Sequence, residues 1–433
     1  MDVSVATARR DTRTVLTVAF RRGDAVPRSE NGSSLVDRAC QLIVLVLYPI
    51  SRARLLLRPS TNHGTDLDFY FGYVQRAANG EVPYRDFAIE YPPAAWLLMR
   101  APATTDWVAY VHRFAWIATA LEVAAFALFV AIVWQLSPRR FWLVAATYVV
   151  TTTLLREFLP TRLDGGLLFL LMLWSWWTLV PGQAGMTATR ALAYGVLGFA
   201  TSYKLAPVLM LPFALVHDSR RARGGELWIL LLSFAVGAAL PFILVWPASG
   251  AASFGFLTYH IERGLEIESV WATLLWPARW LGRPLSAAHV ENTIELIGPA
   301  TGTLAQLSGA VALGATAWCL AAETARPWRG SAIVVGALGL SVFVVLSKVL
   351  SPQYFVWLLP LLAVAGTEAL ESDHAHWWWC AGLVGVAALT TLIYPRFFLA
   401  VIEMRPLGFL LLFSRNALLV ALIASLARHV WKK

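Results

Sequence analysis

The sequence predicts an all-α, polytopic membrane protein with about ten to twelve transmembrane segments. Of its 433 residues, 58% are hydrophobic and only 14% are charged, whereas soluble globular chains average about 45–50% apolar and about 25% charged residues. Ten apolar runs approach the roughly 20 residues that cross about 30 Å of hydrocarbon. The net charge of +9 comes largely from short basic clusters between the runs, which is typical of cytoplasmic loops. A soluble enzyme, a disordered chain and a nucleic-acid partner are therefore not expected.

The first element is a polar, Arg-rich segment, residues 1–35, which we interpret as a cytoplasmic tail near anionic membrane lipids. Residues 36–433 are expected to form the transmembrane domain. The first apolar run is the weakest because Arg52 and Arg54 interrupt it, although long cationic side chains can snorkel to the interface. In order, the predicted runs are 39–57, 109–135, 141–158, 164–181, 226–247, 304–322, 331–349, 354–370, 376–394 and 407–428.

One segment between the fourth and fifth runs does not fit a straight crossing. A single span over 190–217 would place the basic cluster 220–223 outside, against the positive-inside tendency. Two half-helices that meet near 202–204 would instead return the chain to the cytoplasmic side, and irregular backbone at this depth is tolerated where it lines a cavity. We therefore predict a re-entrant hairpin, two cytoplasmic termini, and two long loops, at about 58–108 and 248–303, on the outer face.

The three cysteines predict buried thiols, because each lies inside or beside an apolar run and none has paired spacing. They are Cys40, Cys319 and Cys380. Neither a disulfide framework nor a metal site is expected.

The first long loop carries carboxylates that could act as a general base. Asp66 and Asp68 come first, and Asp86 and Glu90 follow about 20 residues later. A carboxylate at a membrane-facing cavity can accept the proton of an attacking hydroxyl. The loop also carries rings that suit sugar stacking or the headgroup region, at Phe69, Tyr70, Tyr84 and Tyr91. A solvated acidic loop with an aromatic belt is the alternative interpretation.

The second long loop offers candidate phosphate ligands. His260 and Arg263 lie beside a membrane boundary, with Glu268 a few residues further on. The guanidinium of Arg263 presents a fork of donors that can bind two phosphate oxygens at once. His260 could donate to phosphate or carry a proton. A surface helix with internal salt bridges would explain the same residues.

Two lysines and one charged turn complete the candidate residues. Lys204 and Lys348 lie in apolar surroundings, where an ionisable side chain usually faces a cavity or a partner. Lys348 is close to the end of its run and could simply snorkel. The turn 157–164 contains Glu157, Arg162 and Asp164, for which a local ion-pair network is the plainest interpretation.

These segments resemble the multispanning GT-C glycosyltransferases, and most closely glycosyltransferase family 87. The ordered set of motifs, over about residues 60 to 360, is more specific than any single motif. The motifs are Asp66-Leu-Asp-Phe-Tyr70, Gly80…Pro83-Tyr84, Tyr91-Pro-Pro93, Lys204-Leu-Ala-Pro207, His260-Ile-Glu-Arg263-Gly-Leu-Glu-Ile-Glu268-Ser269 and Lys348…Ser351-Pro-Gln-Tyr354…Trp357. The family includes polyprenol-phosphate-mannose-dependent α-mannosyltransferases of phosphatidylinositol mannoside synthesis.

The resemblance implies transfer of a sugar, with mannose favoured over arabinofuranose, from a polyprenyl-phosphate donor to a lipid or glycolipid acceptor. The reaction would be an inverting single displacement without cofactor or metal, at the periplasmic or exterior face of the cytoplasmic membrane. Asp66 matches the position of the catalytic base, and Asp68 is a second carboxylate next to it. Donor phosphate would be bound by Lys204, His260, Arg263 and Lys348. Further substrate contacts are expected from Tyr70, Tyr84, Glu90, Tyr91, Glu268, Gln353 and Tyr354.

A transporter or flippase for a lipid-linked or anionic substrate is the rival interpretation. Such proteins also place ionisable residues along a cavity and use broken helices. Against it, no inverted repeat is visible, and the polar residues concentrate on one face rather than at mid-depth. A purely structural membrane protein would not need Lys204 in an apolar run.

Overall fold

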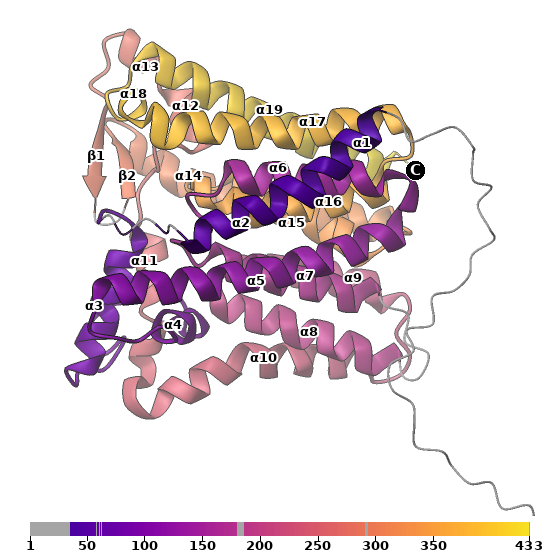
Figure 1. Ribbon diagram of the computed structural model, residues 1–433, viewed down its shortest axis with the longest axis horizontal. Helices are drawn as coiled ribbons and strands as arrows, with labels where there is room; N and C mark the ends of the chain where they lie inside the picture. The colour runs from indigo at the N-terminus through magenta and orange to yellow at the C-terminus, as the bar shows by residue number, and fades with distance from the viewer. Residues whose placement is uncertain are drawn as a thin grey trace, which may run out of the picture.

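The computed structural model describes residues 35–432 except 58, 60, 62, 180–185, 291 and 292. The predicted tail therefore lies outside the described residues, apart from residue 35. The long helices lie side by side along the horizontal direction of Figure 1, and the long connections gather at the end that carries the labels α3, α11 and β1. We call this end, formed by the loops 58–106 and 250–300, the loop end.

Six helical segments are long and apolar enough to cross a membrane, and each falls on a predicted run. They are Leu35–Leu57, Trp107–Leu136, Glu226–Glu262, Thr301–Ala325, Asp373–Arg396 and Pro406–Trp431. The corresponding helices are α1 (Leu35–Leu42) with α2 (Tyr48–Leu57), α5 (Trp107–Leu136), α10 (Glu226–Ser249) with α11 (Phe256–Glu262), α14 (Thr301–Ala325), α17 (Asp373–Thr391) and α19 (Pro406–Trp431). This is the architecture expected of a multi-pass membrane protein.

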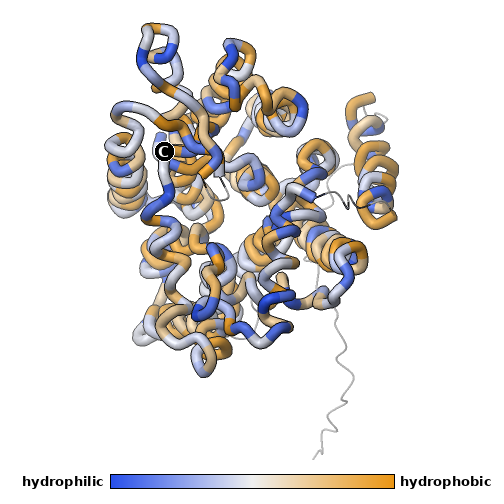
Figure 2. Tube along the Cα trace, turned by 90° about the vertical axis from the view of Figure 1, so that its left-hand side faces the viewer, coloured by the Kyte–Doolittle hydropathy of each residue, from blue (hydrophilic) through white to orange (hydrophobic). Residues whose placement is uncertain are grey.

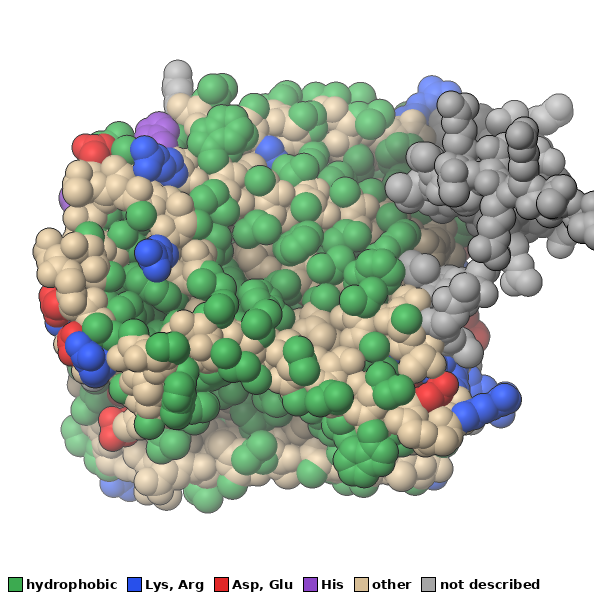
Figure 3. Space-filling model, turned by 90° about the horizontal axis from the view of Figure 1, so that it is seen from below, with side chains coloured by type: hydrophobic (Ala, Val, Ile, Leu, Met, Phe, Trp, Pro, Cys, Tyr) green, Lys and Arg blue, Asp and Glu red, His purple; other side chains and the backbone are tan. Residues whose placement is uncertain are grey.

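The outer surface of the molecule agrees with a multi-pass membrane protein. Seen from below, charged side chains gather near the two ends of the molecule, and hydrophobic side chains cover most of the belt between them (Figure 3). The view onto the loop end shows hydrophilic segments in the loops and mainly hydrophobic helices around them (Figure 2). Exposed apolar side chains are numerous in this belt, for example Trp228 at 76% and Leu232 at 65% exposure. In water such a surface would be costly, whereas in lipid it is the preferred one.

The other four predicted runs form helices that are shorter than a full span. They are α6 (Phe141–Leu154), α7 (Asp164–Leu179), α15 (Ala332–Leu346) and α16 (Phe355–Ala369). At 1.5 Å per residue they extend only about 21–24 Å. The chain turns at 155–163 and at 347–354, both at the loop end, so these helices stop early there and leave room for a cavity. Helices α15 and α16 are buried along nearly their whole length, as is expected of helices with apolar residues on all sides.

The segment for which a re-entrant hairpin was predicted forms two helices joined by a turn. Helix α8 (Met186–Tyr203) ends beside Lys204, and the chain returns through a 3-10 turn and α9 (Leu211–Ser219). The hydroxyl of Tyr194 donates to Asp218 Oδ2 at 3.1 Å, which joins the middle of α8 to the end of α9. With 18 and 14 residues, the two arms are longer than half-helices. The return places Arg220 beside Glu323 at the end of α14, at 2.7 Å.

The described residues differ from the all-α expectation at one place. Strands β1 (Ser286–Val290) and β2 (Thr293–Ile297) pair in antiparallel register, with Ser286 opposite Ile297, inside the second long loop. Five-residue strands are too short for a period-2 pattern to stand out from a loop, so periodicity did not predict them. The loop end also holds the short helices α3 (Asp66–Ala78), α4 (Pro93–Arg100), α12 (Val270–Leu275), α13 (Pro277–Trp280) and α18 (Phe398–Ile402).

The prediction of buried thiols is confirmed. Cys40, Cys319 and Cys380 are free and buried. Their exposed fractions are between 3% and 6%.

Candidate functional site

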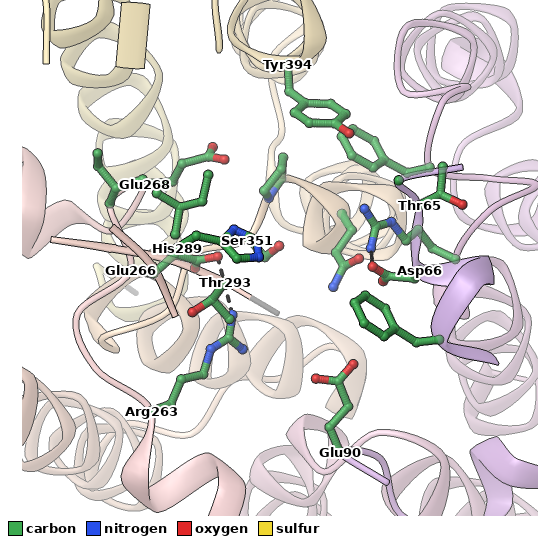
Figure 4. A pocket seen from close by; sticks show the side chains of 18 of the residues that line it. Thr65, Asp66, Glu90, Arg263, Glu266, Glu268, His289, Thr293, Ser351 and Tyr394 are labelled. Atoms are coloured by element: carbon green, nitrogen blue, oxygen red, sulfur yellow. Dashed lines mark ion pairs between the residues drawn. The ribbon is translucent and has the colours of Figure 1, made fainter. Parts of the chain in front are cut away.

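A cavity of about 390 Å³ lies at the loop end. Its wall takes side chains from the start of α3 and from the turns 155–163 and 347–354. The second long loop, with its β-hairpin, also contributes side chains (Figure 4). More than half of the predicted site residues line it, namely Asp66, Asp68, Glu90, Tyr91, Arg263, Glu268 and Gln353. The two long loops, far apart in the sequence, therefore meet at one cavity.

Asp66 lies on one wall of the cavity, at the first residue of α3. Helix α3 starts there because Thr65 is its N-cap, with the Thr65 hydroxyl accepting from the Leu67 N–H at 3.3 Å. A carboxylate is favourable at this position because the helix dipole is positive at its N-terminus. Asp66 forms an ion pair with Arg162 from the turn 155–163. The Tyr70 hydroxyl donates to Asp66 Oδ2 at 3.4 Å.

Asp68 has a capping role in the same helix. Its Oδ2 accepts from the backbone N–H groups of Gly64 at 2.6 Å and Thr65 at 3.1 Å, and its Oδ1 contacts His63. Burial raises the pKa of Asp68, but these hydrogen bonds outweigh it and hold the pKa below the ordinary value. A carboxylate whose oxygens are occupied in this way is a weaker base than a free one. Asp68 is thus tied to its own helix N-terminus, whereas the partner of Asp66 is Arg162, which is itself a wall residue of the cavity.

Arg263 and Glu266 form the opposite wall (Figure 4). Arg263 Nη2 lies 3.5 Å from Glu266 Oε1, and the Leu350 N–H donates to Glu266 Oε2 at 2.7 Å. Burial is the largest single influence and lowers the pKa of Arg263, but the Glu266 carboxylate and other neighbouring groups together raise it by more, so the guanidinium stays protonated. Its Nε–H has no hydrogen-bond partner among the described residues. Arg263 thus retains donor capacity that its ion pair does not use.

Glu266 itself is strongly affected by its surroundings. Burial raises the pKa of Glu266 to about 7, with Arg263 opposing the change and Glu268 adding to it. Glu266 is therefore a carboxyl group that titrates near neutral pH on the wall of the cavity.

Glu268 lines the cavity but is also held from behind. Arg415 of α19, which is fully buried, pairs with the Glu268 carboxylate and donates to its carbonyl oxygen at 2.8 Å. Asn416 donates to the same carbonyl at 3.2 Å. Glu268 therefore anchors the second long loop to α19 in addition to facing the cavity.

Lys204 is placed in a buried ion pair and is not among the residues that line the cavity. Its Nζ donates to Asp164 Oδ1 at 2.6 Å, and the Trp357 indole donates to the same oxygen at 2.8 Å. The ammonium also lies 5.8 Å from the ring centroid of Tyr91 and 5.5 Å from that of Tyr354. In this structure Lys204 stabilises the start of α7 beside the site.

Lys348 and His260 also lie next to the cavity rather than on its wall. Lys348 Nζ donates to the carbonyl oxygen of Ile261 at 2.8 Å and to that of Arg263, so it fixes the backbone that carries Arg263. His260 packs edge-on against Tyr259, with ring centroids 5.5 Å apart. Of the four predicted phosphate ligands, only Arg263 lines the cavity in the part of the chain that the structure describes.

The remaining predicted aromatics support the cavity from behind. Tyr84 donates to the carbonyl oxygen of Tyr91 at 3.0 Å, and Tyr70 packs edge-on against Tyr91 with centroids 6.1 Å apart. Tyr354 provides the ring beneath Lys204. Only Tyr91 of these four tyrosines lines the cavity, so the others orient it rather than face a ligand.

Several wall residues were not among the predicted site residues. They are Arg162, Glu266, His289, Thr293, Ser351 and Tyr394, among others. Arg162 lay in a turn that we interpreted as a local ion-pair network. The structure corrects this for Arg162, which pairs with Asp66, and for Asp164, which pairs with Lys204, whereas Glu157 does pair with its neighbour Arg156. Glu266 was visible inside the motif that contains Arg263, but no sequence feature distinguished it from its neighbours.

Within the described ranges, no group of three or more His, Cys, Asp or Glu side chains is placed to hold a metal ion. No protein-family model matches the sequence, and no curated protein matches it. Fold and site together define a class, a mainly α-helical chain with six helical segments long and apolar enough to cross a membrane and a charged cavity at one end. The resemblance to glycosyltransferase family 87 remains a prediction that rests on the motifs.

Proposed function

We propose that this chain is a membrane glycosyltransferase that moves a sugar, mannose by resemblance, from a polyprenyl-phosphate donor to a lipid or glycolipid acceptor. One observation carries the proposal. A single cavity has the Asp66 carboxylate on one wall and the largely buried Arg263 guanidinium on the facing wall (Figure 4). These are the two charges that such a transfer needs, a base for the acceptor and a cation for the leaving phosphate.

The reaction follows from this arrangement. The acceptor hydroxyl gives its proton to Asp66 as its oxygen attacks the anomeric carbon of the donor sugar. The bond between that carbon and the phosphate oxygen breaks, and the phosphate leaves with the electron pair. Arg263 stabilises the developing negative charge with charge-assisted hydrogen bonds. Because attack and departure occur on opposite faces of the carbon, the configuration inverts.

Other wall residues suit a sugar. A cavity of about 390 Å³ falls within the range of roughly 300–1,000 Å³ that is usual for small-molecule sites. Phe69, Tyr91 and Tyr394 offer ring surfaces along the wall, and the Glu90 carboxylate points into the cavity (Figure 4), where it can accept hydrogen bonds from sugar hydroxyls. In the proposed orientation, the cavity opens on the outer face of the cytoplasmic membrane, where lipid-linked donors are reached without a nucleotide site.

The proposal is tested with the purified full chain in detergent. A panel of polyprenyl-phosphate sugars and lipid acceptors is offered, and new glycolipids are detected by mass spectrometry. Asp66→Asn is expected to lower turnover by at least about 100-fold, the usual contribution of a general base, while Asp68→Asn retains most of it. Both variants replace a carboxylate in the same helix turn, so Asp68→Asn is the matched control.

Two outcomes would contradict the proposal. Full turnover in Asp66→Asn together with loss in Asp68→Asn would move the base role to Asp68. Movement of a lipid-linked substrate across proteoliposomes, without any new glycosidic bond from the whole donor panel, would favour the transporter or flippase.

A further inference from the structure

A second cavity, of about 280 Å³, lies at the end of the molecule opposite the loop end. The start of α8, the end of α9, the start of α15 and the end of α16 surround it. The charged and titratable residues on its wall are Arg190, His217, Asp218, Arg221, Arg329 and Glu368. None of these residues takes part in the proposed transfer reaction, so this cavity needs an explanation of its own.

His217 is the residue that points to a ligand. Only 3% of it is exposed, and it lies on the cavity wall. Neither of its ring nitrogens has a hydrogen-bond partner among the described residues. A buried polar group without a partner is costly, and in native proteins such a group usually faces a bound water, ion or ligand.

The cavity wall also carries more positive than negative charge, with three arginines against two carboxylates. Arg221 and Arg329 are exposed at its rim and form no ion pair in the described part of the chain. Arg190 lies 4.0 Å from Asp218. Three guanidinium groups from three separate segments thus surround one small space.

The two carboxylates on the wall already have partners. Asp218 accepts a hydrogen bond from Tyr194 at 3.1 Å in addition to its pairing with Arg190. Glu368 accepts from the backbone N–H and the hydroxyl of Ser331 at the start of α15. Because the three arginines of the wall outnumber these two carboxylates, the cavity keeps a net positive charge that suits an anion.

We propose that this second cavity binds a phosphate group. Arg221 and Arg329 would each offer a fork of donors to phosphate oxygens, and His217 would supply a hydrogen bond from the buried side. The group could be borne by an anionic lipid headgroup or by a free phosphate. Basic pockets between transmembrane helices at a membrane boundary are suited to anionic headgroups, so the lipid is the source we expect. This site is separate from the proposed transfer site and does not depend on it.

The test measures binding to the purified full chain in detergent, without any assay of sugar transfer. Phosphatidylglycerol is titrated and retained lipid is counted by native mass spectrometry. Inorganic phosphate is titrated separately against chloride at equal ionic strength, with the thermal midpoint as readout. The Arg221→Ala, Arg329→Ala double variant is expected to bind the lipid at least about 10-fold more weakly, since it loses two sets of charge-assisted hydrogen bonds. The matched control is Arg139→Ala with Arg326→Ala, two exposed arginines that are not part of the cavity wall.

The outcomes separate the two sources. Retention of phosphatidylglycerol by the wild type and the control, and its loss in the double variant, supports a lipid headgroup. Stabilisation by inorganic phosphate that the double variant lacks, without lipid retention, supports a free phosphate ligand. Equal binding to wild type and double variant, or no binding of either probe, overturns the proposal. If the double variant does not fold, Arg221→Gln alone takes its place and is held to the same criterion.

Discussion

At the scale of single residues, the buried charges at the loop end are held by partners from distant parts of the chain. Asp66 pairs with Arg162, Lys204 with Asp164, and Glu268 with Arg415. An unpaired charge in this environment would be very costly, so each pair also fixes the position of the segments that it joins. These ion pairs therefore hold in place the segments around the cavity.

Glu266 supplies a pH dependence of stability that can be measured. Its pKa in the folded protein is about 7, against an ordinary value of 4.5. Between these two values the folded state binds more protons than the unfolded state, so the free energy of unfolding falls as pH rises through this window. Since one pKa unit corresponds to about 1.4 kcal/mol, the expected loss is on the order of 3 kcal/mol.

The measurement compares thermal midpoints of the wild type and Glu266→Gln in detergent at pH 5 and pH 8. Taking the difference between the two proteins cancels the other titrating groups. The midpoint of the wild type is expected to fall relative to that of Glu266→Gln as the pH rises. Parallel pH curves for the two proteins would rule out a raised pKa at Glu266.

The sequence indicated which residues belong near the site more reliably than it indicated which groups those residues contact. Asp66 and Arg263 were predicted to share one cavity, and both line it. Lys204 and Lys348 became candidate residues because charges in apolar surroundings need a partner, and the family resemblance implied donor phosphate as that partner. That need is met here by the Asp164 carboxylate for Lys204 and by backbone carbonyls for Lys348. No spacing in the sequence distinguishes an internal partner from a ligand, since the partners come from other segments.

At the scale of elements, helices α8 and α10 approach each other more closely than ordinary side chains allow. A Cβ atom at Gly198 would lie 2.1 Å from the Phe234 carbonyl oxygen, and one at Gly237 would lie 2.0 Å from that of Gly195. Small residues at such positions let helix backbones pack directly in a membrane. The close contact joins α8 to α10, and α8 ends beside Lys204.

Adding a methyl group at this contact should therefore be destabilising. Gly198→Ala or Gly237→Ala is expected to cost about 1–3 kcal/mol, as overpacking generally does, and to lower the thermal midpoint in detergent. The control is Gly314→Ala in α14, where a Cβ would meet no atom within 4 Å. That change should be neutral or slightly stabilising, because alanine is the better helix former. A fall in midpoint of equal size in all three variants would argue against the close packing.

Element boundaries were predictable only in part. All ten apolar runs contain a helix, because continuous apolar stretches of that length have few other structures available in a membrane. Their early ends at the loop end were not predicted, since residues such as Phe158 and Val349 are apolar and continue the pattern past the last helical turn. In the turns beyond these ends, Arg162 pairs with Asp66, and Lys348 donates to the carbonyl oxygens of the second long loop, which are contacts between distant segments that the sequence does not reveal.

At the scale of the whole molecule, the two ends differ in their construction. The loop end has long connections and the larger cavity, whereas the opposite end has short turns with basic clusters, including Arg139, Arg220 and Arg329. The ion pair between Arg220 and Glu323 and that between Arg140 and Asp373 join turns at this opposite end. The positive-inside tendency then predicts that this end faces the cytoplasm and the loop end faces outward.

Cysteine labelling tests that orientation directly. Asn79→Cys places a thiol on an exposed position at the loop end, and Arg223→Cys places one at the opposite end. The native cysteines are buried, so the wild type is expected to stay unlabelled and provides the background. A membrane-impermeant maleimide should label Asn79→Cys on intact cells, and Arg223→Cys only after the membrane is opened, because charged reagents do not cross the hydrocarbon core. The reverse pattern would place the cavity on the cytoplasmic side and exclude transfer on the outer face. Labelling of both thiols on intact cells would contradict a chain that spans the membrane between them.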